Sequence, residues 1–324
     1  MAMLRSALAV LLVASIAHAV AASRQAIDIA AIDDDAQAPR IAQGALGAPV
    51  VRAQILLDRA WFSVGEIDGR FGENMRKAVR AFQSARGLAE SGVIDAATWE
   101  ALNDTDDDVL TTYTITEKDA AGPFTRVPRD IMDQARLPRL GYQNIAEMLS
   151  ERFHVAPALL RELNPEASFV AGEDITVPDV QATKASAKVA SVAILKRERV
   201  LRALDREGHV VAQFPVSLGT RREELETGRF KIVSALRNPV FRFDPAKLDD
   251  RNPRHAKARI APGPNSPIGV VWLGLDKPHY GIHGTPEPSK VGRTQTHGCV
   301  HLTNWDALKL AAVAAPGVPV DVRG

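Results

Sequence analysis

The reactive side chains of this sequence gather around residue 299. Cys299 is the only cysteine among 324 residues, and three of the eight histidines, His283, His297 and His301, lie within nineteen positions that include it. A thiol nucleophile needs a neighbouring base that removes its proton, and histidine is well suited to that task. The sequence therefore predicts a cysteine nucleophile with a histidine base.

The spacing favours one pair. His283 and Cys299 are sixteen residues apart, and Thr285–Thr296 between them is rich in Pro, Gly, Ser and Thr and could fold back. A His–Cys pair lowers the pKa of the thiol and raises that of the imidazole. Gly284 and Gly298 leave backbone groups accessible. We expect the first to orient the imidazole through its carbonyl and the second to donate its amide to an oxyanion.

A metal site is the rival interpretation. His279 and His283 are four residues apart, as are His297 and His301, and zinc favours histidine and cysteine ligands. Positions 279 and 283 would share a face in a strand. However, Glu287 is the only nearby carboxylate that could serve as a base for zinc-bound water. We therefore expect no metal and no other cofactor.

The first residues predict export. Arg5 precedes the apolar run Ala7–Ala17, and small residues with an A-x-A pattern follow up to Ala21. This pattern is typical of a secretory signal peptide, here residues 1–22, because the apolar run is too short to span a bilayer. No other stretch is apolar for long enough, so we expect no transmembrane segment. In an oxidising compartment a sole cysteine that lies near histidines is expected to be free and functional.

The composition and the charge distribution limit the kinds of partner that the sequence suits. Aromatic residues make up only 5% of the sequence, which argues against an aromatic-lined platform for nucleic acid or carbohydrate. Residues 23–181 contain 16 Lys and Arg but 26 Asp and Glu, whereas residues 182–324 contain 23 Lys and Arg but only 13 Asp and Glu. The basic C-terminal part suits an acidic substrate, although the two parts could equally attract each other.

The chain divides into several units before the reactive residues. Residues 23–48 lack periodicity and predict a flexible leader. Residues 49–104 predict a small bundle of three helices around Phe71, Phe82 and Leu102, with Asn74 and Asp95 as helix caps. Residues 105–181 predict a linker and a small α+β module with two helices, near 145–153 and 157–164, a front strand at 140–142 and a last strand at 175–177.

Residues 182–324 change character. β-branched runs with period two alternate with turn residues, which predicts a mostly-β sandwich or barrel with one helix, Trp305–Ala314. The predicted strand runs are 192–194, 200–204, 209–216, 228–232, 269–273 and 318–322.

The C-terminal unit resembles the YkuD-type L,D-transpeptidases. His283-Gly-Thr285 followed by Thr296-His297-Gly298-Cys299 fits their motif H-x(14–17)-[S/T]-H-G-C. The resemblance implies that Cys299 attacks a peptidoglycan stem tetrapeptide, releases D-alanine and passes the acyl group to an amine. It implies His283 as base, Gly284 as its orienting carbonyl, and the amides of Gly298 and Cys299 as oxyanion donors, with His297 shaping the turn. Thr296 and His301 would bind substrate. The family commonly has arginine at position 301.

Two further resemblances point to the cell wall. Gly65-x-Ile67-Asp68-Gly69-x-Phe71-Gly72 and Ala78-x-x-x-Phe82-Gln83 are similar to the peptidoglycan-binding domain type 1. Leu163-Asn164-Pro165 and Ile175-x-Val177-Pro178 are similar to a LysM module, which binds glycans. Together the resemblances imply a periplasmic L,D-transpeptidase whose partners are stem peptides and glycan, with a wall-linked lipoprotein as one acceptor. The alternatives are a hydrolytic L,D-carboxypeptidase or amidase with the same thiol, or a non-catalytic wall-binding protein.

Overall fold

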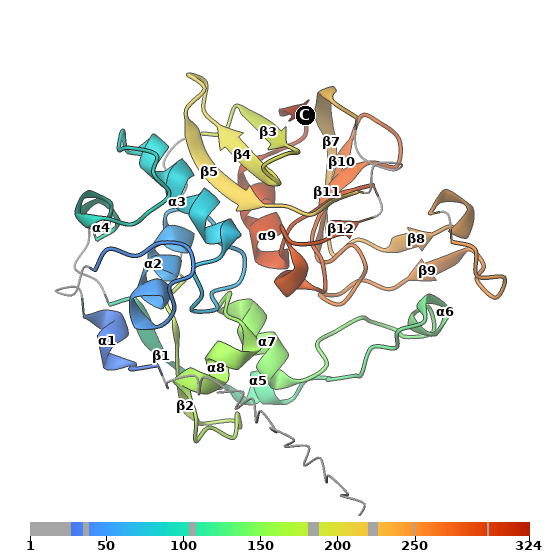
Figure 1. Cartoon of the computed structure of the whole chain (residues 1–324). Coiled ribbons are helices and arrows are strands. Elements are labelled where there is room, and N and C mark those ends of the chain that lie inside the picture. The colour runs from blue at the N-terminus through green and yellow to red at the C-terminus, as the bar shows by residue number, and fades with distance from the viewer. Residues whose placement is uncertain are drawn as a thin grey trace, which may run out of the picture.

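The computed structural model describes residues 27–34, 39–103, 108–180, 188–219, 226–248, 250–296 and 298–324. The predicted signal peptide lies outside these residues. Within the described parts, no helix combines the length and the apolar character needed to span a membrane. Three modules follow one another along the chain (Figure 1): a helical module (39–103), a middle module (108–180) and a C-terminal module (188–324).

The helical module contains α2 (Ala48–Arg59), α3 (Glu73–Ala85) and α4 (Ala96–Leu102). Its three predicted core residues, Phe71, Phe82 and Leu102, are all buried. The Asp95 side chain accepts a hydrogen bond from the amide of Thr98 and so caps α4. The predicted three-helix bundle is therefore confirmed.

Two expectations for this region are wrong. The predicted flexible leader is packed where it is described: Ile32, in the short helix α1 (Ala30–Asp33), is fully buried against the bundle, and Ile41 pairs with Ile94 in an antiparallel bridge. Asn74 does not cap α3, because the helix begins after Gly72 and no side chain caps it. Instead, the Asn74 amide donates to the carbonyl of Val291 in the C-terminal module, 3.0 Å away.

The middle module pairs strand β1 (Leu110–Thr114) with β2 (Asp174–Pro178) in antiparallel fashion, and α7 (Ile145–Arg152) and α8 (Pro157–Leu163) lie between them in sequence. The two helices and the last strand were predicted, but the front strand was placed wrongly at residues 140–142. The alternation in Leu-Thr-Thr-Tyr-Thr supplies the strand, with Leu110 facing the core. The module is α+β, and its likeness to LysM stays a prediction.

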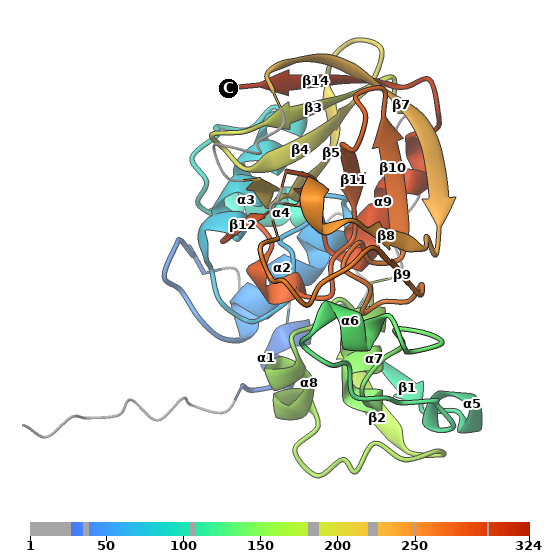
Figure 2. The same cartoon turned by 90° about the vertical axis from the view of Figure 1, so that its right-hand side faces the viewer.

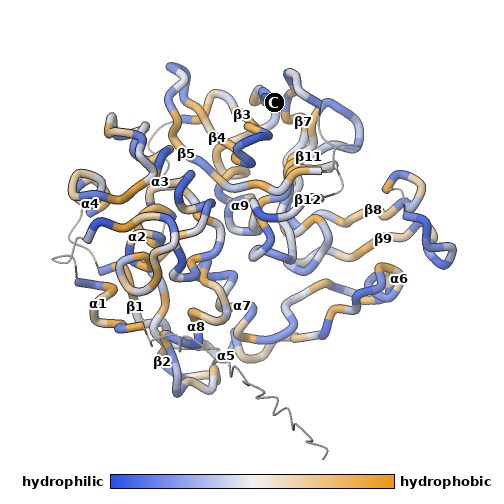
Figure 3. Tube along the Cα trace, viewed as in Figure 1, coloured by the Kyte–Doolittle hydropathy of each residue, from blue (hydrophilic) through white to orange (hydrophobic). Residues whose placement is uncertain are grey.

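The long connection between β1 and α7 reaches across to the C-terminal module. We name residues 115–144 the arm; it contains α5 (Glu117–Ala120) and α6 (Ile131–Gln134). Leu140 of the arm is buried with Phe243 and Ile260 of a hairpin formed by β8 (Phe241–Phe243) and β9 (Ala258–Ile260). Apolar residues recur along α6, β8 and β9 (orange in Figure 3), so this contact is a small separate core.

The C-terminal module is built on an eight-stranded mixed sheet in the order β13-β11-β10-β7-β14-β3-β4-β5. The sheet curls around α9 (Asn304–Val313), as Figure 2 shows, and α9 buries Ala307 and Leu310 against it. The predicted mostly-β module with one α-helix is thus confirmed for the described residues, as a curled single sheet. Its strands are β3 (Ser191–Leu195), β4 (Val200–Leu204), β5 (Val210–Pro215), β7 (Gly228–Arg237), β10 (Val271–Leu275), β11 (Gly281–His283), β13 (Val300–His301) and β14 (Pro319–Arg323). A small separate ladder joins β6 (Leu218–Gly219) to β12 (Gln295–Thr296).

The helical module covers one edge of this sheet. Phe62 forms a parallel bridge with Gln213 of the edge strand β5, and the Gln213 side chain donates to the carbonyl of Lys77 in α3. The Trp61 ring packs edge-on against Phe214, at 6.5 Å between centroids. An edge strand with unpaired backbone groups would otherwise be open to aggregation, so this docking satisfies and protects β5.

All three modules meet at a buried polar junction. Lys309 on α9 donates to the Oδ2 atom of Asp58 on α2 at 2.8 Å, and His154 of the middle module lies 2.9 Å from the same oxygen. The Asp58 side chain is fully buried. Burial alone would raise the pKa of Asp58, but the charges of Lys309 and His154 outweigh it and hold that pKa well below its usual range. The junction therefore joins the modules through an ionised buried carboxylate.

Candidate active site

Three neighbouring strands align a row of rings on one face of the sheet. Trp272 on β10 is opposite His283 on β11, and His283 is opposite His301 on β13. The Trp272 and His283 rings stack with centroids 5.4 Å apart, and the His283 and His301 centroids are 4.2 Å apart. Because side chains alternate along a strand, Ile282 and Val300 point the other way and are fully buried in the core. The core thus fixes the direction in which His283 points.

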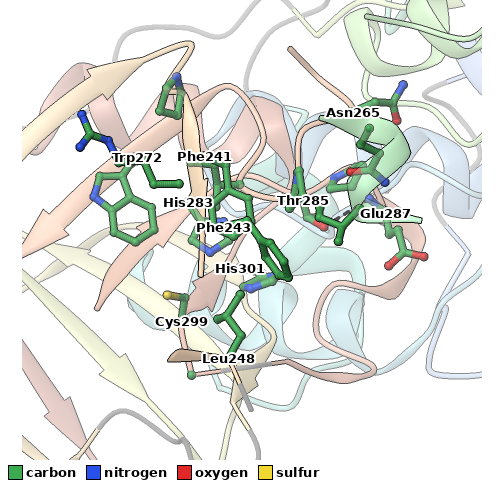
Figure 4. Close-up of a pocket in the computed structure, with 18 of the residues that line it drawn as sticks. Phe241, Phe243, Leu248, Asn265, Trp272, His283, Thr285, Glu287, Cys299 and His301 are labelled. Atoms are coloured by element: carbon green, nitrogen blue, oxygen red, sulfur yellow. Dashed lines mark hydrogen bonds between the residues drawn. The ribbon is translucent and has the colours of Figure 1, made fainter. Parts of the chain in front are cut away.

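Cys299 lies on the same face, one residue before β13. Gly298 precedes it with φ +85°, a conformation that favours glycine, and this turn leads Cys299 into the site. The Cys299 thiol is directed at the carbonyl oxygen of His279, 3.7 Å from Sγ. Cys299 and His283 line the same cleft (Figure 4), so the loop between them does fold back as the spacing predicted.

The backbone orients the His283 imidazole. Its Nδ1 lies 2.7 Å from the carbonyl oxygen of Gly284. A carbonyl can only accept, so Nδ1 carries the proton and the neutral ring presents Nε2 as the basic nitrogen. His283 is buried, with 2% of its surface exposed. The structure therefore contains the orienting contact that was predicted for Gly284.

The predicted direction of the pKa shifts is wrong. Burial raises the pKa of the Cys299 thiol to about 11, against a weaker opposing effect of the Gly281 backbone. Burial also lowers the pKa of His283 to about 4, which its bond to Gly284 only partly offsets. Both shifts arise because burial favours the uncharged form of each group. At neutral pH the free protein holds a thiol beside a neutral imidazole.

The other predicted site residues are placed as follows. Gly298 is buried beside the cleft, and His301 is half-buried in it with its backbone paired to Ser217. The backbone of Thr296 belongs to β12, which pairs with β6. His297 and the side chain of Thr296 lie outside the described residues. The roles in oxyanion and substrate binding therefore stay predictions.

The cleft around these residues has a volume of about 1280 Å³ and walls from two modules. One wall comes from the C-terminal module itself and includes Trp272, Phe241 and Phe243. Another part of the lining comes from the arm and includes Arg129, Ile131 and Gln134. The middle module therefore takes part in shaping the site and is not a remote appendage.

The cleft is lined by charged side chains of both signs. Arg129 from the arm and Arg242 from β8 line it, and both are exposed. Lys290 is paired with Glu287 at its rim. Lys247 and three carboxylates, Asp130, Asp244 and Asp250, line the cleft as well, so its lining has no net positive charge that would match the basic balance of the C-terminal sequence.

Metal binding receives no support from the geometry of the described residues. Among them, no group of three or more His, Cys, Asp or Glu side chains is placed to hold a metal ion. His279 is exposed, and its ring contacts the amine of Lys247 at 3.2 Å. Its side chain is therefore engaged with a cation rather than with His283.

Comparison with known proteins agrees with this site. Residues 190–322 match the YkuD family, described as the L,D-transpeptidase catalytic domain, and residues 47–102 match the family described as "Putative peptidoglycan binding domain". The two resemblances of these parts of the chain, to the L,D-transpeptidase catalytic domain and to the peptidoglycan-binding domain, are thus confirmed. We refer to the C-terminal module as the catalytic domain from here on.

Individual relatives give the extent of the similarity. "Putative L,D-transpeptidase YkuD" of Bacillus subtilis is 27% identical over 173 residues, which cover 53% of this chain and 88% of the relative. A protein of Fuscovulum blasticum, "Putative L,D-transpeptidase in ATP synthase subunits region ORF 5", is 31% identical over 38% of this chain and 64% of its own length. The crystal structure of an L,D-transpeptidase from Xylanimonas cellulosilytica covers 89% of this chain and 99% of its own, at 18% identity and a TM-score of 0.38.

Three features of the site were missed from the sequence. Trp272 was assigned only to a strand, although its alternation with the buried Val271 and Leu273 places it on the other face. Asn304 lies just before the predicted helix Trp305–Ala314 and was given no role. No local sequence pattern predicted the arm's place in the site, because its contacts depend on residues more than a hundred positions away.

Proposed function

We propose that this protein is an exported L,D-transpeptidase that remodels peptidoglycan in the periplasm. In the reaction, Cys299 Sγ attacks the carbonyl that links the third stem residue to the terminal D-alanine. The thiol proton passes to Nε2 of His283 and then to the leaving amine, so D-alanine departs and a thioester remains. An amine attacks the thioester, and the thiol is restored.

The observation that carries the proposal is the shared cleft of Cys299 and His283, with His283 Nδ1 held by the Gly284 carbonyl. This carbonyl takes the place that a carboxylate occupies in other triads. Because the thiol pKa is raised and the imidazole pKa is lowered, proton transfer accompanies the attack on the substrate instead of preceding it. The amides of Gly298 and Cys299 would stabilise the oxyanion.

The remaining modules would hold the enzyme on the wall. The helical module matches a peptidoglycan-binding family, and the middle module resembles LysM, so both would contact glycan or stem peptides. Two exposed arginines of the cleft, Arg129 and Arg242, would suit the carboxylates of a stem peptide. The acceptor amine would come from a neighbouring stem, a free D-amino acid or a wall-linked lipoprotein.

The test is release of D-alanine from a disaccharide tetrapeptide by the mature protein, with Cys299→Ala and Cys299→Ser as variants. We expect release by the wild type, a mass increase on Cys299 that corresponds to the acyl-enzyme, and no release by either variant. Full activity of Cys299→Ala would overturn the mechanism. Product masses with and without an added amine then separate transfer from hydrolysis, because only transfer yields a product that contains the amine.

A further inference from the structure

One of the contacts between the middle module and the catalytic domain is made by a half-buried carboxylate. Glu151 lies at the end of α7, and both of its carboxylate oxygens accept from the side-chain amide of Asn304, at 3.0 and 3.1 Å. The Tyr142 hydroxyl donates to the same carboxylate at 3.3 Å. The site described above does not use Glu151, although its partner Asn304 is the first residue of α9.

Asn304 is held from every side. It is 1% exposed, and its Nδ2 atom donates to the carbonyl of Pro264 as well as to Glu151. Its Oδ1 atom accepts from the amide of Val270, 3.2 Å away. Glu151 is the only ionisable partner among these contacts, and burial raises the pKa of its carboxyl to about 7, against the opposing effect of its hydrogen bonds with Asn304 and Tyr142. Together with the backbone of Pro264 and Val270, Glu151 therefore fixes which way the Asn304 amide faces.

The Asn304 amide oxygen packs directly on the backbone of Gly284. A Cβ atom built on Gly284 would lie 2.1 Å from Oδ1 of Asn304, and one built on Gly269 would lie equally close. Only glycine allows this approach. Gly284 is also the residue whose carbonyl holds Nδ1 of His283. A change in the position of the Asn304 side chain would therefore shift the peptide group of Gly284, which orients the imidazole.

We propose that Glu151 of the middle module is a positioning residue for His283, acting through the Asn304 amide and the backbone of Gly284. The inference deepens the proposed function, since it rests on His283 being the base. It assigns the middle module a part in catalysis that is separate from any binding of glycan. The catalytic domain alone would then contain all reacting groups but hold its base less firmly.

The test compares Glu151→Gln with Glu151→Met in the full mature chain. The two replacements have similar size and shape, but only glutamine keeps an oxygen that accepts from Asn304. We expect Glu151→Met to lower kcat for D-alanine release by about tenfold or more with KM within about twofold, because a misoriented base costs rate rather than affinity. Glu151→Gln should retain most of the wild-type kcat.

A second readout needs no activity. In protein labelled with ¹⁵N-histidine, the Nδ1–H proton of His283 should give a signal protected from exchange with water in the wild type and in Glu151→Gln. In Glu151→Met the signal should broaden or exchange rapidly. If the wild type releases no D-alanine and the signal still depends on residue 151, the proposed function fails while the positioning role stands.

Arg152→Ala is the matched control. Arg152 is the neighbour of Glu151 on α7, but it pairs with Asp119 inside the middle module at 2.8 Å. This variant should lower the melting temperature of the protein and leave kcat and the His283 signal unchanged. Equal loss of kcat in Arg152→Ala and Glu151→Met would overturn the proposal, because general loosening of the module would then explain both. Unchanged kcat and His283 signal in a folded Glu151→Met would overturn it as well.

Discussion

The ring centroids of His283 and His301 lie 4.2 Å apart on neighbouring parallel strands. His301→Arg would place a permanent cation beside the site. A cation stabilises the Cys299 thiolate, so we expect the thiol pKa to fall by at least about half a unit. The pH dependence of Cys299 alkylation by iodoacetamide measures this shift directly, since no other cysteine is present. His301→Gln is the uncharged control and should leave the midpoint where it is. An unchanged midpoint in His301→Arg would contradict the expectation.

The wild-type thiol should itself react slowly at neutral pH. Burial raises the pKa of Cys299 to about 11, and an ordinary cysteine has a pKa near 8.5. Alkylation requires the thiolate, so the logarithm of its rate should rise by about one per pH unit from pH 7 to 10. His283 should not add a charge above pH 5, because its pKa lies at about 4. A rate plateau between pH 6 and 8 would instead reveal a preformed ion pair with His283.

Gly284→Ala should be among the most damaging single substitutions in the site. The new methyl group would overlap Oδ1 of Asn304 at 2.1 Å, and both groups are buried with no room to move. Overpacking of this kind costs about 2 kcal/mol or more of unfolding free energy. Thermal or urea unfolding measures the loss, and D-alanine release should fall with it. Gly141→Ala is the control, because its methyl group would meet only the carbonyl oxygen of Pro123 at an ordinary 3.7 Å. Comparable stability of the two variants would argue against the close packing at Asn304.

Lys309→Met should weaken the junction of the three modules. It would leave the carboxylate of Asp58 buried without its cation, and such a loss costs about 3–5 kcal/mol. The pKa of Asp58 lies below its unfolded value, so the junction stabilises the fold above about pH 4 and this stabilisation is lost as the pH falls further. The gap between variant and wild type in urea unfolding should therefore shrink in acid. The double variant Asp58→Leu/Lys309→Met should recover much of the stability; if it is no more stable than Lys309→Met, the uncompensated charge is not the cause.

Much of the fold could be predicted because its signals are local. Period-two runs such as Val200–Leu204 coincide with β4, and the helix predicted at Trp305–Ala314 is α9 within one residue. The same holds for the pairing of His283 with Cys299, since one loop joins them. The motif thus identified the reacting groups before their geometry was known.

The parts that failed depend on distant contacts or on burial. Asn74 looks like a helix cap, but its amide is used by Val291, more than two hundred residues away. The arm lacks periodicity because its few apolar residues pack on a hairpin of another module. The pKa values of Cys299 and His283 follow from the burial of the two side chains, and the spacing of residues in the sequence does not predict burial.

The docking of the helical module on β5 has a consequence for where on the wall the enzyme could act. Backbone pairing of Phe62 with Gln213 and the shared Asp58–Lys309 contact leave little freedom between the wall-binding family domain and the cleft. If the helical module binds one glycan strand of the cell wall, Cys299 can reach only stem peptides at a fixed distance from that binding point. The spacing of its products along the glycan would then reflect the fixed distance between the helical module and Cys299.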